Sequence, residues 1–125
     1  HMAPEENDYI PTARSLGYLR RRGAMVATVE RWNSFAKRRV DLFGFADILA
    51  VDDKIGTLAV QATTGDHVAH RLAKFQTEPV AGKIRRWLSA GNRVQIFGWT
   101  KPSEGGRRKR WALRIVDVTV EDLSA

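Results

Sequence analysis

The fold of this chain is decided by residues 44–63, which read GFADILAVDDKIGTLAVQAT. The apolar residues that open this stretch cover both faces of an extended segment, as is typical of a central strand buried on both sides of a sheet. Residues 52–56 have the composition of a turn, and apolar residues resume after them. We therefore predict a hairpin in which a long strand over 40–51 turns back into a strand over 57–63.

The position of this turn also predicts which side chains face each other. A turn centred on Lys54 places Asp47 directly opposite Gln61. Opposed Cβ atoms in an antiparallel ladder lie about 4.5–5.5 Å apart on one face, and Thr63 follows two residues later on that face. A carboxylate within an apolar strand is costly unless it is paired or bound to a cation. Asp47 and Gln61 therefore indicate a Mg²⁺ site built from oxygen ligands. The alternative is that Asp47 accepts a structural hydrogen bond or forms an ion pair with a nearby arginine.

Helices and further strands surround the hairpin. Apolar residues at helical spacing predict helices before and after it, with Thr12 and Asp66 as N-caps and a break at Pro79. The resulting order α-βββ-α-ββ predicts an α/β (α+β) domain with a mixed central β-sheet flanked by helices. The expected helices cover residues 12–22, the stretch from Asp66 to Pro79, and 80–90, and the further strands cover 24–32, 94–100 and 111–120.

Length and composition fit one globular domain. The chain has 125 residues, of which 43% are hydrophobic, and it has no cysteines for disulfides, thiolate zinc sites or cysteine nucleophiles. His1-Met2 resembles a tag-cleavage scar, and we expect residues 1–10 to be flexible and 11–125 to form the domain. No apolar run approaches the ~20 residues that cross a bilayer, and no secretory leader opens the chain. We therefore expect a cytoplasmic protein without a membrane partner.

Basic residues exceed acidic ones, and they are clustered. The chain has 21 Lys and Arg residues against 14 Asp and Glu residues, which gives a net charge of +7. Clustered arginine is typical of proteins that bind nucleic acid, although ordinary solvated surface is the alternative. The residues that we expect to contact nucleic acid are Arg20, Arg21, Arg22, Lys37, Arg38, Arg39, Arg71, Arg107, Arg108, Lys109 and Arg110.

The last of these clusters lies in a polar loop over 101–110. This loop is long enough to reach along or into a nucleic-acid groove. We expect Trp99 and Trp111 to brace its base as a cross-strand aromatic pair. The alternative is that an exposed tryptophan stacks on an unpaired base.

The hairpin resembles the core motif of the PD-(D/E)XK nuclease superfamily, in particular the Holliday junction resolvase-like and virus-type replication–repair nucleases. Residues 44–49 (GFADIL) are similar to the strand that carries the first acid, with Ala46 where proline often stands. Residues 58–63 (LAVQAT) are similar to the strand that carries (D/E)-X-K. The resemblance covers roughly residues 14–99 and implies a restriction endonuclease-like core.

The resemblance implies roles for the residues that match the motif. Asp47 matches the metal-binding acid, Gln61 stands at the second acid, and Thr63 stands where the lysine is expected. Lys74 is a candidate for a relocated lysine, with an ordinary surface lysine as the alternative. The implied catalytic residues are Asp47, Gln61, Thr63, Lys74 and Glu30, and the implied ligands of Mg²⁺ or Mn²⁺ are Asp47, Gln61 and Glu30.

The third acid is the least determined member of this set. Glu30 is the candidate because it is the only acid between Asp8 and Asp41. Asp41 is its competitor, and an ion pair from Glu30 to Arg31 or Arg39 is the structural alternative.

These inferences together favour a metal-dependent endodeoxyribonuclease that acts on branched or double-stranded DNA in repair or recombination. The resemblance also implies a homodimer, because resolvases cut two symmetric strands. A catalytically inactive nucleic-acid-binding module on the same fold is the first alternative, since Gln61 and Thr63 depart from the motif. A basic protein-interaction domain is the second.

Overall fold

The computed structural model describes residues 6–103 and 110–124, with side chains from residue 10 onward. The expected flexibility of residues 1–5 and the expected contacts of Arg107, Arg108 and Lys109 lie outside the described residues. The described helices are α1 (Glu6–Arg21), α2 (Val68–Phe75) and α3 (Val80–Ser89), and the strands are β1 (Met25–Thr28), β2 (Arg31–Asn33), β3 (Arg38–Val40), β4 (Ile48–Asp52), β5 (Gly56–Thr64), β6 (Arg93–Thr100) and β7 (Ala112–Val118).

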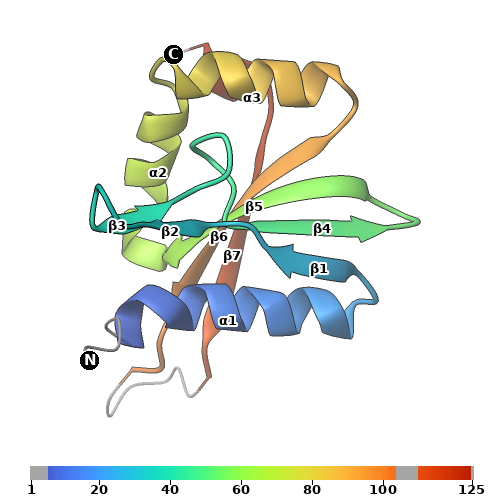
Figure 1. The fold of residues 1–125 in the computed structure, drawn as a ribbon. Helices are drawn as coiled ribbons and strands as arrows, with labels where there is room; N and C mark the ends of the chain where they lie inside the picture. The colour runs from blue at the N-terminus through green and yellow to red at the C-terminus, as the bar shows by residue number, and fades with distance from the viewer. Residues whose placement is uncertain (1–5, 104–109, 125) are drawn as a thin grey trace.

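The architecture is a mixed α+β fold built on a five-stranded sheet. The strand order is β1-β4-β5-β6-β7, in which only the β5–β6 pair is parallel. β2 and β3 form a separate two-stranded ribbon. α1 covers one face of the sheet, and α2 and α3 lie on the other (Figure 1). No helix in the described part of the chain is both long and apolar enough to span a membrane.

The central strand buried on both faces is β5, whereas the sequence predicts such a strand over 40–51. Leu58 and Val60 belong to the core under α1, where they join Leu19 and Phe97. Ala59 faces the other way, into the core between the sheet and the helices α2 and α3. Alternate side chains of one strand therefore enter two separate cores.

The register of the predicted hairpin is confirmed. Val51 pairs with Thr57, Leu49 pairs with Ala59, and the turn closes at Asp52. Asp52 Oδ1 accepts hydrogen bonds from the backbone N–H groups of Lys54 (2.8 Å) and Ile55 (2.7 Å), which hold the turn in place.

The long strand predicted over 40–51 is wrong, because a loop divides it into β3 and β4. Phe43 (φ 56°) and Gly44 (φ 85°) adopt left-handed backbone conformations that an extended strand does not allow. The loop closes through a bridge between Leu42 and Ala46. The Phe43 ring contacts Phe45 and Trp87. The apolar residues of this loop therefore pack on the α3 side and do not extend the sheet.

Two helix starts also differ from the prediction. α1 begins at Glu6, so residues 6–10 are helical, and Thr12 lies inside the helix instead of capping it. A short 3₁₀ turn over Gly65–His67 precedes α2, which therefore begins at Val68 and not at Asp66. The Asp66 carboxylate instead accepts a hydrogen bond from Thr64 Oγ1 at 2.6 Å.

Candidate metal centre and nucleic-acid interface

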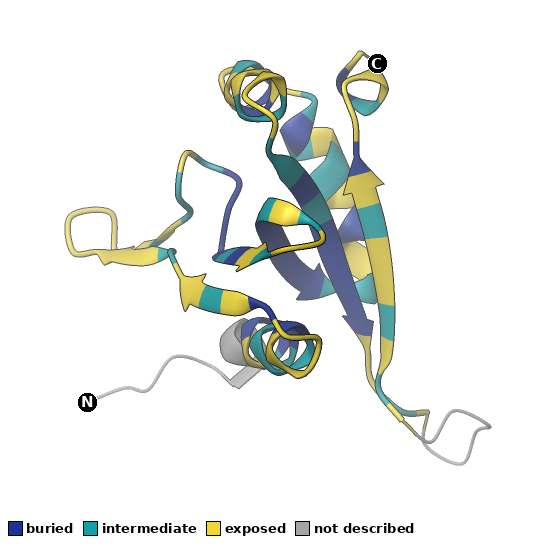
Figure 2. Cartoon of the chain, turned by 90° about the vertical axis from the view of Figure 1, so that its right-hand side faces the viewer, coloured by how far each residue is buried: buried dark blue, intermediate teal, exposed yellow. Residues whose placement is uncertain are grey.

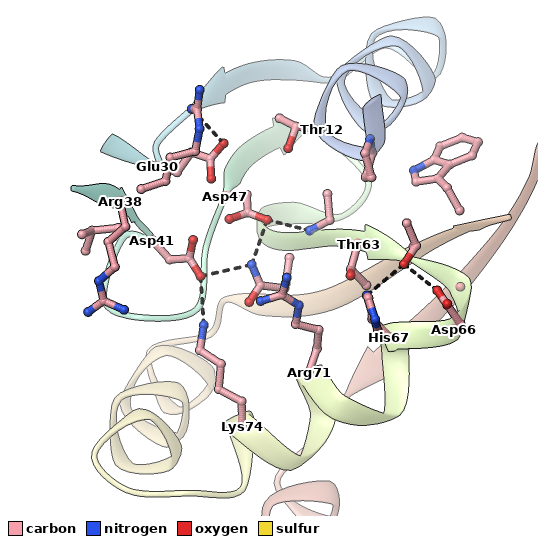
Figure 3. Close-up of a pocket in the computed structure, with 18 of the residues that line it drawn as sticks. Thr12, Glu30, Arg38, Asp41, Asp47, Thr63, Asp66, His67, Arg71 and Lys74 are labelled. Atoms are coloured by element: carbon pink, nitrogen blue, oxygen red, sulfur yellow. Dashed lines mark hydrogen bonds and ion pairs between the residues drawn. The ribbon is translucent and has the colours of Figure 1, made fainter. Parts of the chain in front are cut away.

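A pocket of about 1370 Å³ opens between the two-stranded ribbon, the start of α1, the ends of β5 and β6, and α2. Its floor carries acidic and polar side chains, and its rim carries basic ones (Figure 3). All five residues implied as catalytic line it, namely Glu30, Asp47, Gln61, Thr63 and Lys74.

Three carboxylates converge in this pocket. Glu30, Asp41 and Asp47 each offer one oxygen, and these oxygens lie within 4.8 Å of one another. The structure thus places both Glu30 and its competitor Asp41 beside Asp47. Among the described residues this is the one such group of potential metal ligands.

Backbone pairing explains why acids from three separate segments meet. β1 pairs with β4, and beyond that ladder the N–H groups of Val29 (2.8 Å) and Glu30 (3.4 Å) approach the carbonyl oxygen of Asp47. The loop bridged at Leu42 and Ala46 folds back and brings Asp41 to the same place. Glu30 also forms an ion pair with Arg39, in which Arg39 Nη1 lies 3.4 Å from Glu30 Oε1.

Asp47 lies beside Gln61, at a bend just before β4 and outside the ladder, which ends at the Ile48–Val60 pair. The Asp47 N–H donates to the Val60 carbonyl oxygen at 2.9 Å, one residue out of the β4–β5 register. Asp47 is 4% exposed, and its Oδ2 accepts hydrogen bonds from Gln61 Nε2 (2.8 Å) and the Ala62 N–H (2.9 Å). These two neutral donors are the structural hydrogen bonds that the sequence offers as the alternative to a metal site.

The two neighbouring aspartates have opposite pKa shifts. Burial, followed by the interaction with Asp41, raises the pKa of Asp47 well above its usual value. Burial by itself also raises the pKa of Asp41, but the interaction with Asp47 and the charge of Lys74 outweigh it and leave the pKa of Asp41 lowered. In the metal-free protein Asp47 is therefore the member of the pair that retains a proton more readily.

Gln61 connects the two aspartates. Its Nε2 also donates to Asp41 Oδ2 at 3.2 Å, so the amide nitrogen bridges both carboxylates. Gln61 is 1% exposed, and its Oε1 is buried without a hydrogen-bond partner among the described residues. Rotation of the Gln61 side-chain amide by half a turn exchanges the positions of Nε2 and Oε1. This rotation would direct Oε1 toward the carboxylates. Two carboxylate groups bridged by an amide whose oxygen lacks a partner fit a hard divalent cation such as Mg²⁺.

Two cations approach the acids from α2. Lys74 Nζ donates to Asp41 Oδ2 at 3.1 Å, so Lys74 reaches the acidic group while its side chain stays 35% exposed. Arg71, one helical turn earlier, points into the pocket beside the acids (Figure 3). Its Nε is buried and lacks a hydrogen-bond partner among the described residues. The i, i+3 spacing of these residues places both on one face of α2.

Thr63 is buried on the pocket wall and, two residues after Gln61, shares its face of β5. Thr63 carries a hydroxyl and not the ammonium group that the resemblance leads one to expect at this position. Lys74 and Arg71 are the positive groups that the fold supplies nearby.

The predicted basic clusters lie in different places. Lys37, Arg38 and Arg39 line the pocket. Arg20 and Arg21 lie in the last turn of α1, at the opposite end of that helix from the pocket residues Pro11 and Thr12 (Figure 1). Arg22 lines a second, smaller pocket beside Met25, and Arg110 is an exposed residue next to Trp111.

The predicted Trp99–Trp111 pair is wrong. Trp99 pairs with Leu113 across β6 and β7, and Trp111 precedes β7. Trp99 is buried and donates from Nε1 to Ser15 Oγ at 2.9 Å. The guanidinium of Arg14 lies over the Trp111 ring, 3.8 Å from the ring centre, in a cation–π contact. Both tryptophans line the pocket. Each also contacts a polar side chain of α1, Ser15 or Arg14, so the pocket wall packs against that helix.

Comparison of the chain with protein-family models, curated proteins and solved structures gives no match in any of the three.

Proposed function

We propose that this protein is a metal-dependent nuclease that hydrolyses phosphodiester bonds in branched or structured DNA. The observation that carries the proposal is the meeting of Glu30, Asp41 and Asp47 around Gln61, whose buried Oε1 has no partner among the described residues. Oxygen ligands of this kind are the ones that Mg²⁺ and Mn²⁺ prefer. The β4–β5 hairpin would then be a divergent form of the PD-(D/E)XK motif, with Gln61 in place of the second acid.

Each group in the pocket has a part in this proposal. Asp47, Asp41, Glu30 and the Gln61 carbonyl oxygen would hold the ion. A bound Mg²⁺ would lower the pKa of a water molecule and stabilise the negative charge that develops on the phosphate. Arg71 would contact the phosphate oxygens, because its guanidinium enters the pocket without an ion pair among the described residues.

Lys74 would balance the charge of the acids. It already neutralises Asp41, and on entry of a cation it could turn from Asp41 to the phosphate. One such acidic group is found in the described part of the chain, so cleavage of two strands at one site requires two chains. We therefore include a homodimer in the proposal.

The test is cleavage of labelled four-way junction, flap and linear duplex DNA with Mg²⁺, with Mn²⁺ and with EDTA. We expect metal-dependent nicking that Asp47→Asn abolishes. The matched control is Asp53→Asn, which changes an exposed aspartate in the β4–β5 turn and should leave cleavage unchanged. Absence of cleavage with either metal, or equal cleavage by Asp47→Asn, would contradict the proposal.

A catalytically inactive DNA-binding module is the second candidate. It is favoured by the hydrogen bonds that already satisfy the acids without an ion, from Gln61 to Asp47 and from Lys74 to Asp41. This candidate predicts salt-sensitive DNA binding, no cleavage, and no change in melting temperature on addition of Mg²⁺.

A further inference from the structure

The two-stranded ribbon of β2 and β3 presents two large aromatic side chains to solvent. Trp32 is 61% exposed and Phe35, at the tip, is 99% exposed. Figure 2 shows the ribbon standing away from the five-stranded sheet, with nearly all of its residues exposed. Exposed aromatic area of this kind, rimmed by charge, marks an interaction surface.

The tip is ordered even though it packs against no core. Asn33 Oδ1 accepts hydrogen bonds from the N–H groups of Phe35 (2.9 Å) and Ala36 (3.0 Å). Lys37 closes the turn with a left-handed backbone (φ 55°). The backbone that carries Phe35 is therefore shaped by its own turn, and the Phe35 ring projects from it into solvent.

The charge of the ribbon defines the kind of partner. Residues 31–40 contain Arg31, Lys37, Arg38 and Arg39 and no acid. Cations interleaved with aromatic rings suit nucleic acid, because the cations contact phosphates while the rings stack on bases. An acidic protein would use the cations but would have no need of two rings with open faces.

The ribbon is continuous with the acidic pocket. Trp32 pairs with Arg39 across the ribbon, so the two side chains share a face. Arg39 in turn pairs with Glu30, one of the three acids. Trp32, Lys37 and Arg38 line the same pocket as Asp47.

We propose that the β2–β3 ribbon binds nucleic acid by stacking Trp32 and Phe35 on unpaired or unstacked bases. These bases would lie beside the phosphate that occupies the pocket. A fully paired duplex hides the faces of its bases, so aromatic stacking requires a single-stranded or distorted segment. The substrate class is therefore DNA with exposed bases next to the contacted phosphate. That this phosphate is the one cleaved rests on the proposed function.

The test measures binding by fluorescence anisotropy, in the full chain carrying Asp47→Asn so that no DNA is cut. The DNA probes are a single strand, a duplex, and the same duplex with a short gap. We expect Trp32→Ala and Phe35→Ala each to weaken binding to the strand and the gapped duplex by about 5- to 150-fold. Binding to the intact duplex should change by less than about twofold.

Two control variants separate stacking from other effects. Met25→Ala removes a side chain that is also exposed but lies on β1, away from the pocket, and should change none of the three affinities. Arg38→Ala removes a charge from the ribbon and should weaken all three probes alike, because phosphate contacts do not depend on base pairing. Quenching of tryptophan fluorescence by the single strand should disappear in Trp32→Phe if Trp32 is the ring that stacks.

Three results would overturn the ribbon proposal: no loss of affinity in the alanine variants, equal loss on paired and unpaired DNA, or a changed oligomeric state with unchanged DNA binding. The last would assign the ribbon to self-association. The outcome is separable from that of the nuclease proposal. Metal-dependent cleavage without this discrimination overturns the ribbon proposal alone, and discrimination without cleavage overturns the nuclease proposal alone.

Discussion

Gln61 donates its amide nitrogen to Asp47 Oδ2 at 2.8 Å, while its own carbonyl oxygen is buried without a partner among the described residues. The same nitrogen reaches Asp41 Oδ2 at 3.2 Å. A neutral donor thus bridges two carboxylates that still interact directly, since Asp41 raises the pKa of Asp47. The arrangement leaves one polar atom unsatisfied, and that atom is a potential cation ligand.

Replacing Gln61 by glutamate should make the fold depend on metal. Gln61→Glu replaces the bridging N–H donors with a carboxylate, which leaves buried acceptors unsatisfied at a cost of about 1–3 kcal/mol. We expect a lower melting temperature in EDTA and a larger increase on addition of Mg²⁺ than in the unmodified protein. Thermal unfolding with and without Mg²⁺ measures both.

The control for this variant is Gln95→Glu. Gln95 also donates to an aspartate, Asp117, but the pair is exposed, so the added charge should be screened and should not respond to Mg²⁺. If both variants responded equally to Mg²⁺, the ion would be acting on surface charge and not at Gln61.

The raised pKa of Asp47 predicts how stability varies with pH in the metal-free protein. Because its pKa is higher in the folded than in the unfolded state, Asp47 contributes most stability below the unfolded value of about 3.9. That contribution is lost as pH rises from there through the raised folded pKa. Urea unfolding in EDTA should therefore show a larger decrease in the free energy of unfolding between pH 4 and 8 than the Asp47→Asn variant shows.

Asp41 acts in the opposite direction and in a different pH range. Its pKa is lowered, so its contribution is present above the unfolded value and is lost only as pH falls below it. Asp53→Asn is the control for Asp47→Asn and should follow the unmodified protein. Parallel pH profiles for all three proteins would mean that Asp47 does not carry the raised pKa.

Removing Lys74 should reduce catalysis more than metal binding. Lys74→Ala takes away the cation 3.1 Å from Asp41 Oδ2, and loss of one electrostatic group in an active site costs about 10²- to 10³-fold in kcat. Mg²⁺ affinity should stay the same or increase, because the ion no longer competes with an ammonium group. Single-turnover cleavage and Mg²⁺ titration measure the two effects.

Lys74→Arg should restore part of the activity, since it restores the charge with a different geometry. Lys83→Ala, which removes an exposed lysine from α3, is the control. An equal decrease of kcat in Lys83→Ala would show that general positive charge, and not the position of Lys74, is responsible.

Removing Arg71 should weaken DNA binding at little cost to stability. Arg71→Ala eliminates a buried Nε that has no partner among the described residues, so no ion pair of the described fold is broken. If the guanidinium contacts one phosphate, the slope of log K against log salt concentration should decrease in magnitude by about 1. Salt titrations of Arg71→Ala and of the exposed α3 control Arg86→Ala test this, and an unchanged slope in Arg71→Ala would remove the phosphate contact.

The hairpin could be predicted from the sequence because its determinants are local. The turn at residues 52–56 and the period of two along the flanking strands fix the register of β4 against β5, which brings Asp47, just before β4, next to Gln61. The helix over 80–90 and the last two strands were predictable for the same reason, since their periodicity and end signals lie within each segment.

Other features depend on contacts between distant segments. Phe43 leaves the predicted strand because its ring packs against Trp87, more than 40 residues away in the sequence. The partners of Trp99 and Trp111 were missed because each depends on packing between α1 and the sheet. Trp32 and Phe35 gave a local signal as aromatic residues among cations, but their exposure is visible only in the fold.

The sequence by itself determined the charge of the protein, the hairpin and the pairing of Asp47 with Gln61, because short-range periodicity and turn chemistry specify them. Only the tertiary structure decided that Glu30 and Asp41 both join that pair and that Lys74 reaches it. Those positions follow from the pairing of β1 with β4, from the folded-back loop before β4 and from the packing of α2 on the sheet. Each of these brings together residues that no local pattern relates.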